Sequence, residues 1–294
     1  MTSAPARLRH ALASGEFFLA PGLFDMITAK LAQAQGFAFG YASGYWLTAS
    51  AYGLPDAGIA TFTQMLERIE TLVRTVPGMA IIADADTGYG GLINVRHTML
   101  GYARAGVAAL QLEDQEFPKR CGHSQGKRVV SVGDMVARIK VAVEARDGQD
   151  GPLIIARSDA RAMEGMDAML RRLEAYAAAG ADILFPEALT TEAEMAHVAA
   201  RLPGPAMMNM ADGGHTPILP AATLQAMGFA GAIFPAMTAL ASAAANERAL
   251  RGLFETGTSL NDGVELYSFA RMCSLLGFDE VYAQDARWAA FNQP

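Results

Sequence analysis

The sequence is built from short apolar runs that alternate with longer stretches of helical periodicity, separated by a few polar or turn residues. This alternation is typical of parallel strands connected by helices. Eight runs have the length and composition of buried strands: 17–20, 37–42, 79–83, 108–112, 153–156, 182–185, 206–208 and 231–234. Eight is the number of strands in a closed (β/α)8 barrel. We therefore predict an α/β protein of the TIM-barrel class.

The stretches between these runs carry signals that end helices. Gly36, Gly106, Gly180 and Gly228 each directly follow a helical pattern, where C-terminal caps commonly stand. The predicted helices are 25–35, 63–76, 94–105, 165–179 and 221–227. One barrel accounts for the 294 residues, so we expect a single domain over 1–294. Residues 254–294 are predicted to be a helical extension, with helices at 261–277 and 279–291 that pack on this barrel or on a neighbouring subunit.

Composition limits what such a barrel binds. The formal net charge is -7 and no basic cluster exceeds a few residues, which argues against nucleic acid as the partner. No stretch approaches the roughly 18 consecutive apolar residues of a membrane span. The two cysteines, Cys121 and Cys273, form neither a disulfide framework nor a structural zinc set. We expect a cytoplasmic protein whose partner is a small molecule.

Polar side chains stand at the ends of the predicted strands, where barrels of this class build their active sites. They are Tyr41, Ser43, Asp84, Asp86, Glu113, Asp114, Arg157, Asp159, Glu187 and Asn209. Asp84 and Asp86 are two positions apart, so an extended segment directs both to one side. With Glu113 they form an oxygen donor set suited to Mg2+ rather than Zn2+. The alternative is that these acids cap helices or pair with Arg157.

Residues 118–128, which read PKRCGHSQGKR, place a thiol among cations. Lys119, Arg120 and His123 surround Cys121 in the sequence, a setting that favours the thiolate. We expect Cys121 to act as a nucleophile or as a proton donor and acceptor, the alternative being a small inert hydrophobe. Cys273 lies on an apolar helix pattern and fits that second description.

Eight short motifs occur in one order along the chain: YASG, GLPDAG, DADTGYG, LEDQ, PKRCGH, ARSDA, FPEA and NMADGGHTP. In this set the sequence resembles the isocitrate lyase and phosphoenolpyruvate mutase superfamily, from about Pro21 to the C-terminus. The intact KRCGH is similar to the motif of the carbon–carbon lyases rather than to that of the phosphonate enzymes. The motifs are most similar to those of 2,3-dimethylmalate lyases, petal death protein-like enzymes and methylisocitrate lyases.

The resemblance implies a (β/α)8 barrel whose last helix is exchanged between two subunits, usually in a homotetramer that is a dimer of swapped dimers. It also implies Mg2+ as the cofactor, with Mn2+ as a possible substitute. Asp84, Asp86 and Glu113 match the magnesium-binding acids, and Asp56 matches an acid just outside the metal ligands. Four residues match those that bind the 2-oxo acid fragment in the family. They are Ser43, Gly44 and Tyr45, which match one loop, and Gly122.

Catalytic roles follow from the same resemblance. Cys121 matches the catalytic acid and Tyr41 the tyrosine often proposed as the general base, while Arg157 matches the arginine that clamps and polarises the 2-oxo acid. Two further residues of the KRCGH motif are assigned to the catalytic group, namely Lys119 and His123. Two polar groups match those around the second fragment, namely Glu187 and Asn209.

The implied reaction is a retro-aldol type cleavage of a 2-hydroxy dicarboxylate to pyruvate or glyoxylate and a carboxylic acid. Methylisocitrate lyases hold a third carboxylate with arginines near positions that here read Thr238 to Ala241 and Gly263-Val264, so an alkylmalate is favoured over a tricarboxylate. Tyr45 and Trp46 are bulkier than the residues frequent at these positions in the family, so the sequence does not decide which 2-oxo acid is released. The alternatives are an oxaloacetate hydrolase or decarboxylase, then a methylisocitrate lyase or phosphonate mutase, and a barrel that binds ligands without turnover.

Overall fold

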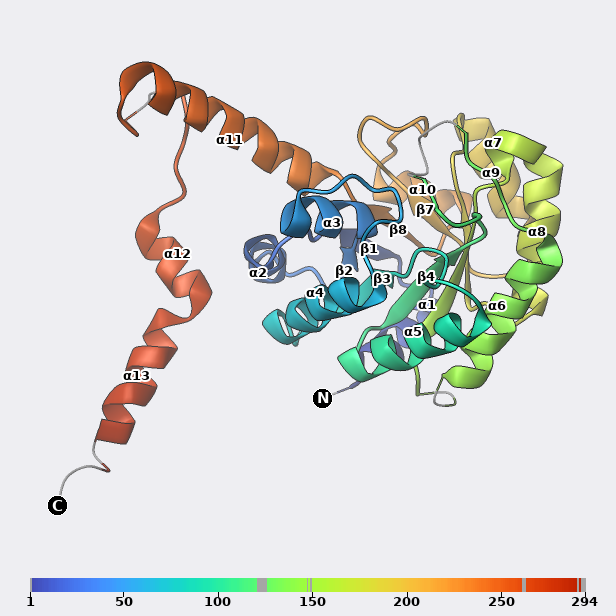
Figure 1. The fold of residues 1–294 in the computed structure, drawn as a ribbon, viewed down its shortest axis with the longest axis horizontal. Helices are drawn as coiled ribbons and strands as arrows, with labels where there is room; N and C mark the ends of the chain where they lie inside the picture. Colours follow the sequence, from blue (N-terminus) through green and yellow to red (C-terminus); the bar gives the residue numbers. More distant parts are fainter. Residues whose placement is uncertain are drawn as a thin grey trace.

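The computed structural model describes residues 2–120, 126–146, 148, 150–260, 263–289 and 291 (Figure 1). These residues form eight parallel strands, and their ends lie within two residues of the predicted ones, so all eight strand predictions are confirmed. The strands are β1 (Phe18–Pro21), β2 (Phe39–Ala42), β3 (Ala80–Asp84), β4 (Ala109–Glu113), β5 (Leu153–Ser158), β6 (Ile183–Pro186), β7 (Met207–Asn209) and β8 (Gly231–Phe234).

The strands follow one another around a barrel. Hydrogen bonding joins them in two groups, β2-β3-β4-β5-β6 and β1-β8-β7, with all pairs parallel. Isolated bridges connect the groups, from Gly22 to Tyr41 between β1 and β2 and from Leu184 to Ala206 between β6 and β7. The predicted (β/α)8 architecture is therefore present within one chain.

Helices cover the outside of the barrel. They are α2 (Met26–Ala34), α3 (Gly44–Tyr52), α4 (Phe62–Thr75), α5 (Leu92–Ala105), α6 (Val132–Ala145), α7 (Arg161–Glu164), α8 (Met166–Ala178), α9 (Glu192–Arg201) and α10 (Ala221–Met227). Helix α4 begins with a capping box in which Thr61 and Gln64 bond each other's backbone. Helix α5 ends at Gly106 in the left-handed conformation expected from its sequence.

Helix α1 (Ala4–Ser14) closes the amino end of the barrel. Its Leu8 and Ala11 belong to the same apolar cluster as Phe18, Ile155 and other inward-facing strand residues. Side chains of α1 also donate hydrogen bonds to Gly78 and Gly151, which precede β3 and β5. Since this end is plugged, a ligand site inside the barrel must open at the carboxyl ends of the strands.

The C-terminal arm, defined here as residues 237–291, leaves the barrel (Figure 1). It comprises α11 (Met237–Thr256), α12 (Phe269–Leu276) and α13 (Phe278–Ala289). Helix α11 starts against β1, where Thr238 donates to the Gly22 carbonyl at 2.7 Å. A side chain at Gly22 would collide there, since its Cβ would lie 2.1 Å from the Pro235 carbonyl oxygen. Helix α12 returns to lie beside α2.

The arm corrects one sequence prediction. A helix was expected from 261 to 277, yet residues 264–268 are not helical and α12 begins only at Phe269. The Ser268 side chain accepts a hydrogen bond from the Arg271 amide and so caps the helix at that point. The following helix, predicted at 279–291, corresponds to α13. Within the described residues, no helix is both long and apolar enough to cross a membrane.

Candidate active site

A cavity of about 300 Å³ opens at the carboxyl ends of the strands. Its apolar lining comes from α3, the segments after β7 and β8, and the first turn of α11: Trp46, Ala211, Ile233, Pro235, Ala236 and Leu240. Its polar lining includes most of the predicted site: Tyr41, Ser43, Tyr45, Asp56, Asp84, Glu113, Lys119, Arg120, Arg157, Asn209 and Asp212. The structure thus brings together residues from distant parts of the sequence, as the strand-end prediction requires.

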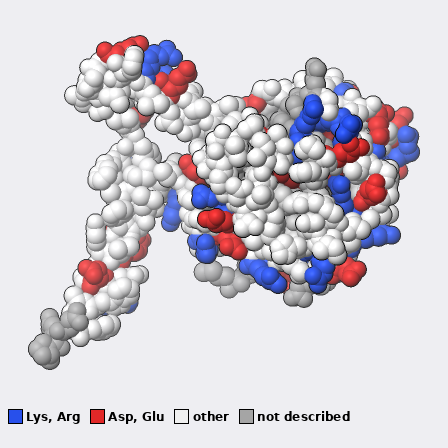
Figure 2. Space-filling model, in the orientation of Figure 1, with Lys and Arg blue, Asp and Glu red and all other residues white. Residues whose placement is uncertain are grey.

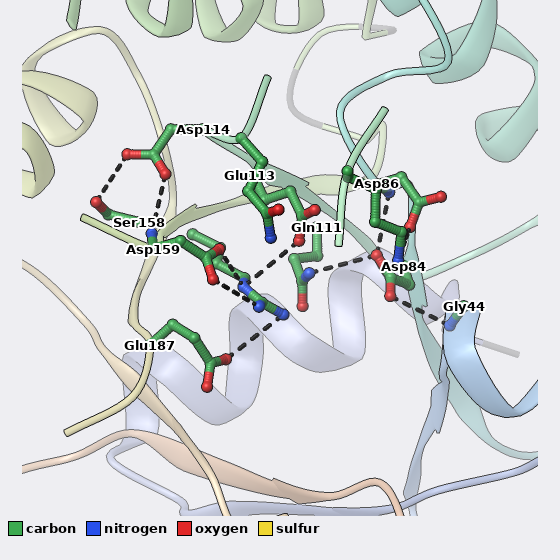
Figure 3. Close-up of polar contacts among 12 residues, drawn as sticks. Gly44, Asp84, Asp86, Gln111, Glu113, Asp114, Ser158, Asp159 and Glu187 are labelled. Atoms are coloured by element: carbon green, nitrogen blue, oxygen red, sulfur yellow. Dashed lines mark hydrogen bonds and ion pairs between the residues drawn. The ribbon is translucent and has the colours of Figure 1, made fainter. Parts of the chain in front are cut away.

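Asp84 ends β3, and both of its carboxylate oxygens accept hydrogen bonds. Its Oδ2 accepts from the Gly44 amide at 3.1 Å, and its Oδ1 accepts from the Asp86 amide at 3.0 Å and from Gln111 Nε2 at 3.3 Å (Figure 3). A Cβ at Gly44 would lie 2.8 Å from Asp84 Oδ2, so only glycine permits this approach. Burial raises the pKa of Asp84, and the charge of Asp86 raises it further.

Lys119 lies among the acids. Its ammonium group is paired with Asp56 and lies 2.9 Å from Asp86 Oδ1, and its side chain is buried. Although burial acts to lower the pKa of Lys119, the charges of Asp86, Glu113 and Asp56 raise it well above the usual value. Lys119 is therefore a fixed positive charge at the cavity wall, and Asp56 lies next to the acids, as predicted.

The acids suit a divalent cation that keeps water and substrate among its ligands. One buried carboxylate oxygen, Glu113 Oε1, accepts no hydrogen bond in the part of the chain that the structure describes, and Asp86 Oδ1 meets only the ammonium group of Lys119 there. Burial raises the pKa of Glu113 well above its usual value, against the lowering effect of the Arg157 charge. Among the same residues no group of three or more acids, histidines or cysteines is arranged so that it could hold a metal ion on its own. This pattern fits Mg2+, which commonly takes only one or two protein carboxylates.

Arg157 ends β5 in the middle of a ring of acids. Its Nε and Nη2 donate to Asp159 at 2.9 and 3.1 Å, and its guanidinium lies 3.5 Å from Glu113 and 3.4 Å from Glu187 (Figure 3). The guanidinium carbon also lies 5.3 Å from the centre of the Phe185 ring. Burial acts to lower the pKa of Arg157, but these carboxylates raise it well above its usual value. A charged, rigidly held guanidinium thus lines the cavity.

Asn209 and Glu187 lie together as the sequence predicted. Asn209 Nδ2 donates to Glu187 Oε2 at 3.2 Å, and the Ala188 amide donates to Glu187 Oε1 at 3.0 Å. Ala188 holds a positive φ of 61°, a conformation that a residue with a side chain rarely adopts. The strained backbone and the two hydrogen bonds fix the Glu187 carboxylate beside Arg157.

Tyr41 is part of a polar relay within the barrel. Its hydroxyl donates to Gln111 Oε1 at 2.8 Å, and Gln111 in turn donates to Asp84. Burial raises the pKa of Tyr41 well above its usual value, and the charge of Asp84 adds to this effect. Gln111 was missed in the sequence because a single glutamine inside an apolar strand gives no signal; its position two residues before Glu113 was the available clue.

The predicted carboxylate-binding loop is a helix terminus. Ser43 is the N-cap of α3, and Gly44 and Tyr45 form its first turn. The loop prediction at 43–45 is wrong in this respect, because the polar Ser43 precedes a run of apolar and aromatic residues that continues as a helix to Tyr52. A helix N-terminus at this position favours an anion site, since the first amides of a helix attract negative charge.

Three of the predicted residues, Cys121, Gly122 and His123, lie outside the described residues. The chain on both sides of this motif is tied to the barrel through Lys119 and Lys127. Beyond Lys127, an antiparallel bridge pairs Gln115 with Val129.

Asp159 was noted in the sequence only as a polar residue at a strand end, and Lys127 received no role. Their side chains form a buried ion pair of 2.7 Å next to Arg157. Burial acts to raise the pKa of Asp159, but the charges of Arg157 and Lys127 overcome it and lower the pKa to about 2. Only the fold reveals this cluster, because 32 residues separate the two.

Fold and site together define a TIM-barrel enzyme with a cavity lined by charged residues at the carboxyl ends of its strands. The family model for phosphoenolpyruvate phosphomutase matches residues 8–254. The chain is 38% identical over 293 residues to the 2,3-dimethylmalate lyase of Eubacterium barkeri, covering 97% of this chain and 98% of that one. It is 39% identical over 279 residues to the 2-methylisocitrate lyase of Aeropyrum pernix, covering 95% and 89%. The chain belongs to the PEP mutase/isocitrate lyase superfamily, which confirms the predicted resemblance.

Solved structures show the same relationship. A 2,3-dimethylmalate lyase superposes with a TM-score of 0.92 at 37% identity, covering 99% of this chain and 98% of that one. An oxaloacetate acetylhydrolase bound to 3,3-difluorooxalacetate also gives 0.92, at 34% identity and 98% coverage of both chains. A phosphonopyruvate hydrolase in complex with oxalate and Mg2+ gives 0.88 at 29% identity, covering 98% and 99%. The superfamily fold is thus shared by lyases and by hydrolases.

Proposed function

We propose that this protein is a Mg2+-dependent carbon–carbon lyase that cleaves a 2-hydroxy dicarboxylate of the alkylmalate type to a 2-oxo acid, pyruvate or glyoxylate, and a carboxylic acid. The observation that carries this proposal is the mixed lining of the cavity. Carboxylates and Arg157 contribute charged groups to it, and Trp46, Pro235 and Leu240 contribute apolar surface. Such a cavity offers a polar site for a 2-oxo acid and an apolar site for alkyl groups.

Mg2+ or Mn2+ would be held by Asp84 and Asp86, with Glu113 and Asp56 outside these two acids. When bound, the cation would supply Lewis-acid stabilisation of the negative charge on the 2-oxo acid oxygens. Support for this set comes from the unbonded Glu113 Oε1 and from the related phosphonopyruvate hydrolase complex that contains Mg2+.

Residues of the chain itself bind and orient the two fragments of the substrate. The first turn of α3, at Ser43 to Tyr45, binds the carboxylate of the 2-oxo acid fragment, and Gly122 belongs to the same subsite. Arg157 adds a fixed positive charge that stabilises the developing anion. Glu187 and Asn209 orient the second fragment.

Proton transfers begin and end the cleavage. The phenolate form of Tyr41, which the charge of Arg157 favours against burial, accepts the proton of the 2-hydroxyl. The C2–C3 bond breaks as C2 becomes the carbonyl carbon of the 2-oxo acid, and the electron pair of that bond passes to the departing carboxylic acid as an enolate. Cys121 then donates a proton to that carbon, with Lys119 and His123 as the cations beside it in the sequence. Because burial favours the protonated form of Tyr41, the Tyr41→Phe variant is the direct test of its role as base.

The apolar lining of the cavity supports an alkylmalate as the substrate rather than a tricarboxylate. Leu240 lines the cavity near the positions where the resemblance places an arginine for a third carboxylate, and Thr238 there bonds the Gly22 carbonyl instead. A buried third carboxylate without a cation would be costly. The cationic lining residues Lys119 and Arg120 belong to the segment after β4 and not to α11.

The C-terminal arm is the basis of the proposed assembly. We take residues 1–294 as one barrel domain with 254–294 as its helical extension, exchanged between two subunits in a dimer of swapped dimers. Large apolar side chains of the arm are exposed in the single chain, including Phe254, Leu260, Leu266, Phe269, Val281 and Phe291. A soluble protein rarely leaves so many uncovered, so a second copy would bury them. Molar mass from light scattering tests this, with four subunits expected.

A second candidate function is oxaloacetate hydrolysis, favoured by the 0.92 TM-score to oxaloacetate acetylhydrolase. The products separate the two functions. A lyase releases a 2-oxo acid from an alkylmalate, whereas the hydrolase converts oxaloacetate and water to oxalate and acetate. Assaying 2-oxo acid, oxalate and acetate from 2,3-dimethylmalate, 2-methylmalate and oxaloacetate therefore tests the proposal. Oxalate with acetate from oxaloacetate, and no 2-oxo acid from any malate, would overturn it.

A further inference from the structure

Lys127 is a buried cation for which the proposed reaction has no use. Its side chain is 3% exposed, and its ammonium lies 2.7 Å from Asp159 Oδ1. Burying an ammonium group is unfavourable unless a carboxylate compensates its charge, so this placement needs a reason. The Asp159 carboxylate also binds Arg157, and this second contact supplies the reason.

Asp159 binds two cations at once. Oδ1 accepts from Lys127 and from Arg157 Nη2, while Oδ2 accepts from Arg157 Nε. The two nitrogens of Arg157 therefore meet both oxygens, a bidentate contact that fixes the plane of the guanidinium. Lys127 holds the carboxylate from its other side.

The backbone of Asp159 is fixed as well. Its amide donates to Asp114 Oδ1 at 2.9 Å, and Asp114 Oδ2 accepts from Ser158 Oγ (Figure 3). The Tyr176 hydroxyl also donates to Asp114 Oδ2. All of these groups are fully buried. The Asp159 side chain can still rotate, and Lys127 opposes that rotation by holding Oδ1.

The charges around Arg157 give Lys127 a second effect. Asp159, Glu113 and Glu187 all lie within 3.5 Å of the guanidinium, so three acids compete for one arginine. Lys127 shares the charge of Asp159, which leaves more of the positive potential of Arg157 for a ligand carboxylate.

We propose that Lys127 is a positioning residue: it holds the Asp159 carboxylate, and Asp159 in turn sets the orientation of Arg157 and preserves its positive charge toward the cavity. This inference rests on the proposed function, because it takes Arg157 as the group that binds the 2-oxo acid. Lys127 itself needs no contact with the substrate.

The test compares Lys127→Met, Lys127→Arg and a matched control in the full-length protein. Methionine keeps most of the buried stem and removes the charge, while arginine retains a cation. The control is Arg146→Met, which removes a half-buried ion pair of 2.5 Å with Asp182, the residue preceding β6 at the amino end of the barrel. Binding of oxalate in the presence of Mg2+ is measured by calorimetry, and KM and kcat are measured on the alkylmalate that the wild type cleaves.

For Lys127→Met we expect oxalate affinity to fall about tenfold and KM to rise similarly, the size seen when groups supporting a ligand-binding residue are removed. Lys127→Arg should recover most of the affinity, and Arg146→Met should leave it unchanged. Equal oxalate affinity in Lys127→Met and the wild type would overturn the inference, as would an equal loss in the Arg146→Met control.

A crystal structure of Lys127→Met separates this inference from the proposed function. We expect the Asp159 carboxylate to rotate and the Arg157 guanidinium to leave its bidentate contact. An unchanged Arg157 and Asp159 would overturn the positioning role whatever reaction the enzyme catalyses. A wild type that releases no 2-oxo acid would instead refute the proposed function, while a displaced Arg157 would still support the role of Lys127.

Discussion

The carboxyl rim of the barrel and the C-terminal arm treat side chains in opposite ways. At the rim, charged residues such as Asp84, Lys119 and Arg157 are buried, and each meets a polar partner from another segment of the chain, namely the Gly44 amide, Asp86 and Glu113 in that order. Along the arm, Phe254 and Phe269 are 93% and 83% exposed, and α12 forms an almost uncharged surface (Figure 2).

The difference shows where each region obtains its stability. Burying charges is favourable only when partners are fixed in place, and at the rim the chain supplies these partners itself. Exposed aromatic rings lack the burial that makes them favourable, so the arm needs a surface from outside its own barrel. We therefore expect rim variants to change catalysis and arm variants to change assembly.

The largest expected effect is the loss of catalysis when the rim acids are altered. Asp84→Asn removes a charge from the proposed cation site, and we expect kcat/KM to fall about a thousandfold or more, as when preorganised electrostatic groups are removed. EDTA should abolish the activity of the wild type, and added Mg2+ should restore it.

The Asp84→Asn variant should keep the molar mass of the wild type, because the rim contributes nothing to assembly in this account. Activity in Asp84→Asn close to the wild-type value, or full activity in EDTA, would remove the basis for the cation site. Secondary structure measured by circular dichroism provides the control for folding.

Variants in the C-terminal arm should change the number of subunits in the assembly. Phe254→Asp combined with Phe269→Asp places two charges where a second subunit is expected to pack, so the mass by light scattering should fall from four subunits to one or two. The control is Lys140→Asp on the exposed face of α6, which should leave the mass unchanged. A double variant that keeps the wild-type mass would show that these rings are not in the interface.

The Asp159 carboxylate should contribute to stability in a pH-dependent way. Its pKa is lowered to about 2 in the folded protein, so its contribution is complete above the unfolded value of about 3.9 and is lost as pH falls toward 2. Asp159→Asn leaves Arg157 and Lys127 without this partner and should cost about 3 kcal/mol at neutral pH.

Urea unfolding at pH 3 and pH 7 measures this effect. The difference between Asp159→Asn and the wild type should be smaller at pH 3. Asp150→Asn, on the exposed surface, is the control and should change stability little at either pH. A difference that is the same at both pH values would contradict the lowered pKa.

The smallest effect is expected on the outside of the barrel, at the capping box of α4. Thr61→Ala should cost about 1 kcal/mol in the free energy of unfolding, because the Gln64 amide loses its side-chain acceptor. Thr63→Ala, two residues further on the exposed surface of the helix, should not lower stability, because alanine has the higher helix propensity. Neither variant should change kcat or the molar mass, and a change in either would mean that rim, arm and outer helices are coupled.

Sequence reasoning went furthest where a local pattern decides the structure. The eight strands and the end of α5 at Gly106 follow from apolar period and end signals, and Asp84, Glu113 and Arg157 were expected because they stand at strand ends. The resemblance to the superfamily came from motifs that the sequence displays directly.

The remaining features depend on contacts between distant segments. Lys127 and Asp159 are 32 residues apart, and Gln111 meets Tyr41 across 70 residues, so neither pair leaves a pattern in the sequence. Helix α3 was taken as a loop because its small and aromatic residues have no clear apolar period. The start of α12 was misplaced because the Ser268 cap was not recognised inside an amphipathic stretch.

The most direct test of the proposed function is the release of 2-oxo acid from malate, 2-methylmalate, 2,3-dimethylmalate, methylisocitrate and oxaloacetate, with Mg2+ or EDTA, by the wild type and Cys121→Ser. We predict turnover of an alkylmalate that requires Mg2+ and is lost in Cys121→Ser, with little activity on methylisocitrate. No 2-oxo acid from any alkylmalate, together with oxalate and acetate from oxaloacetate, would contradict the lyase account.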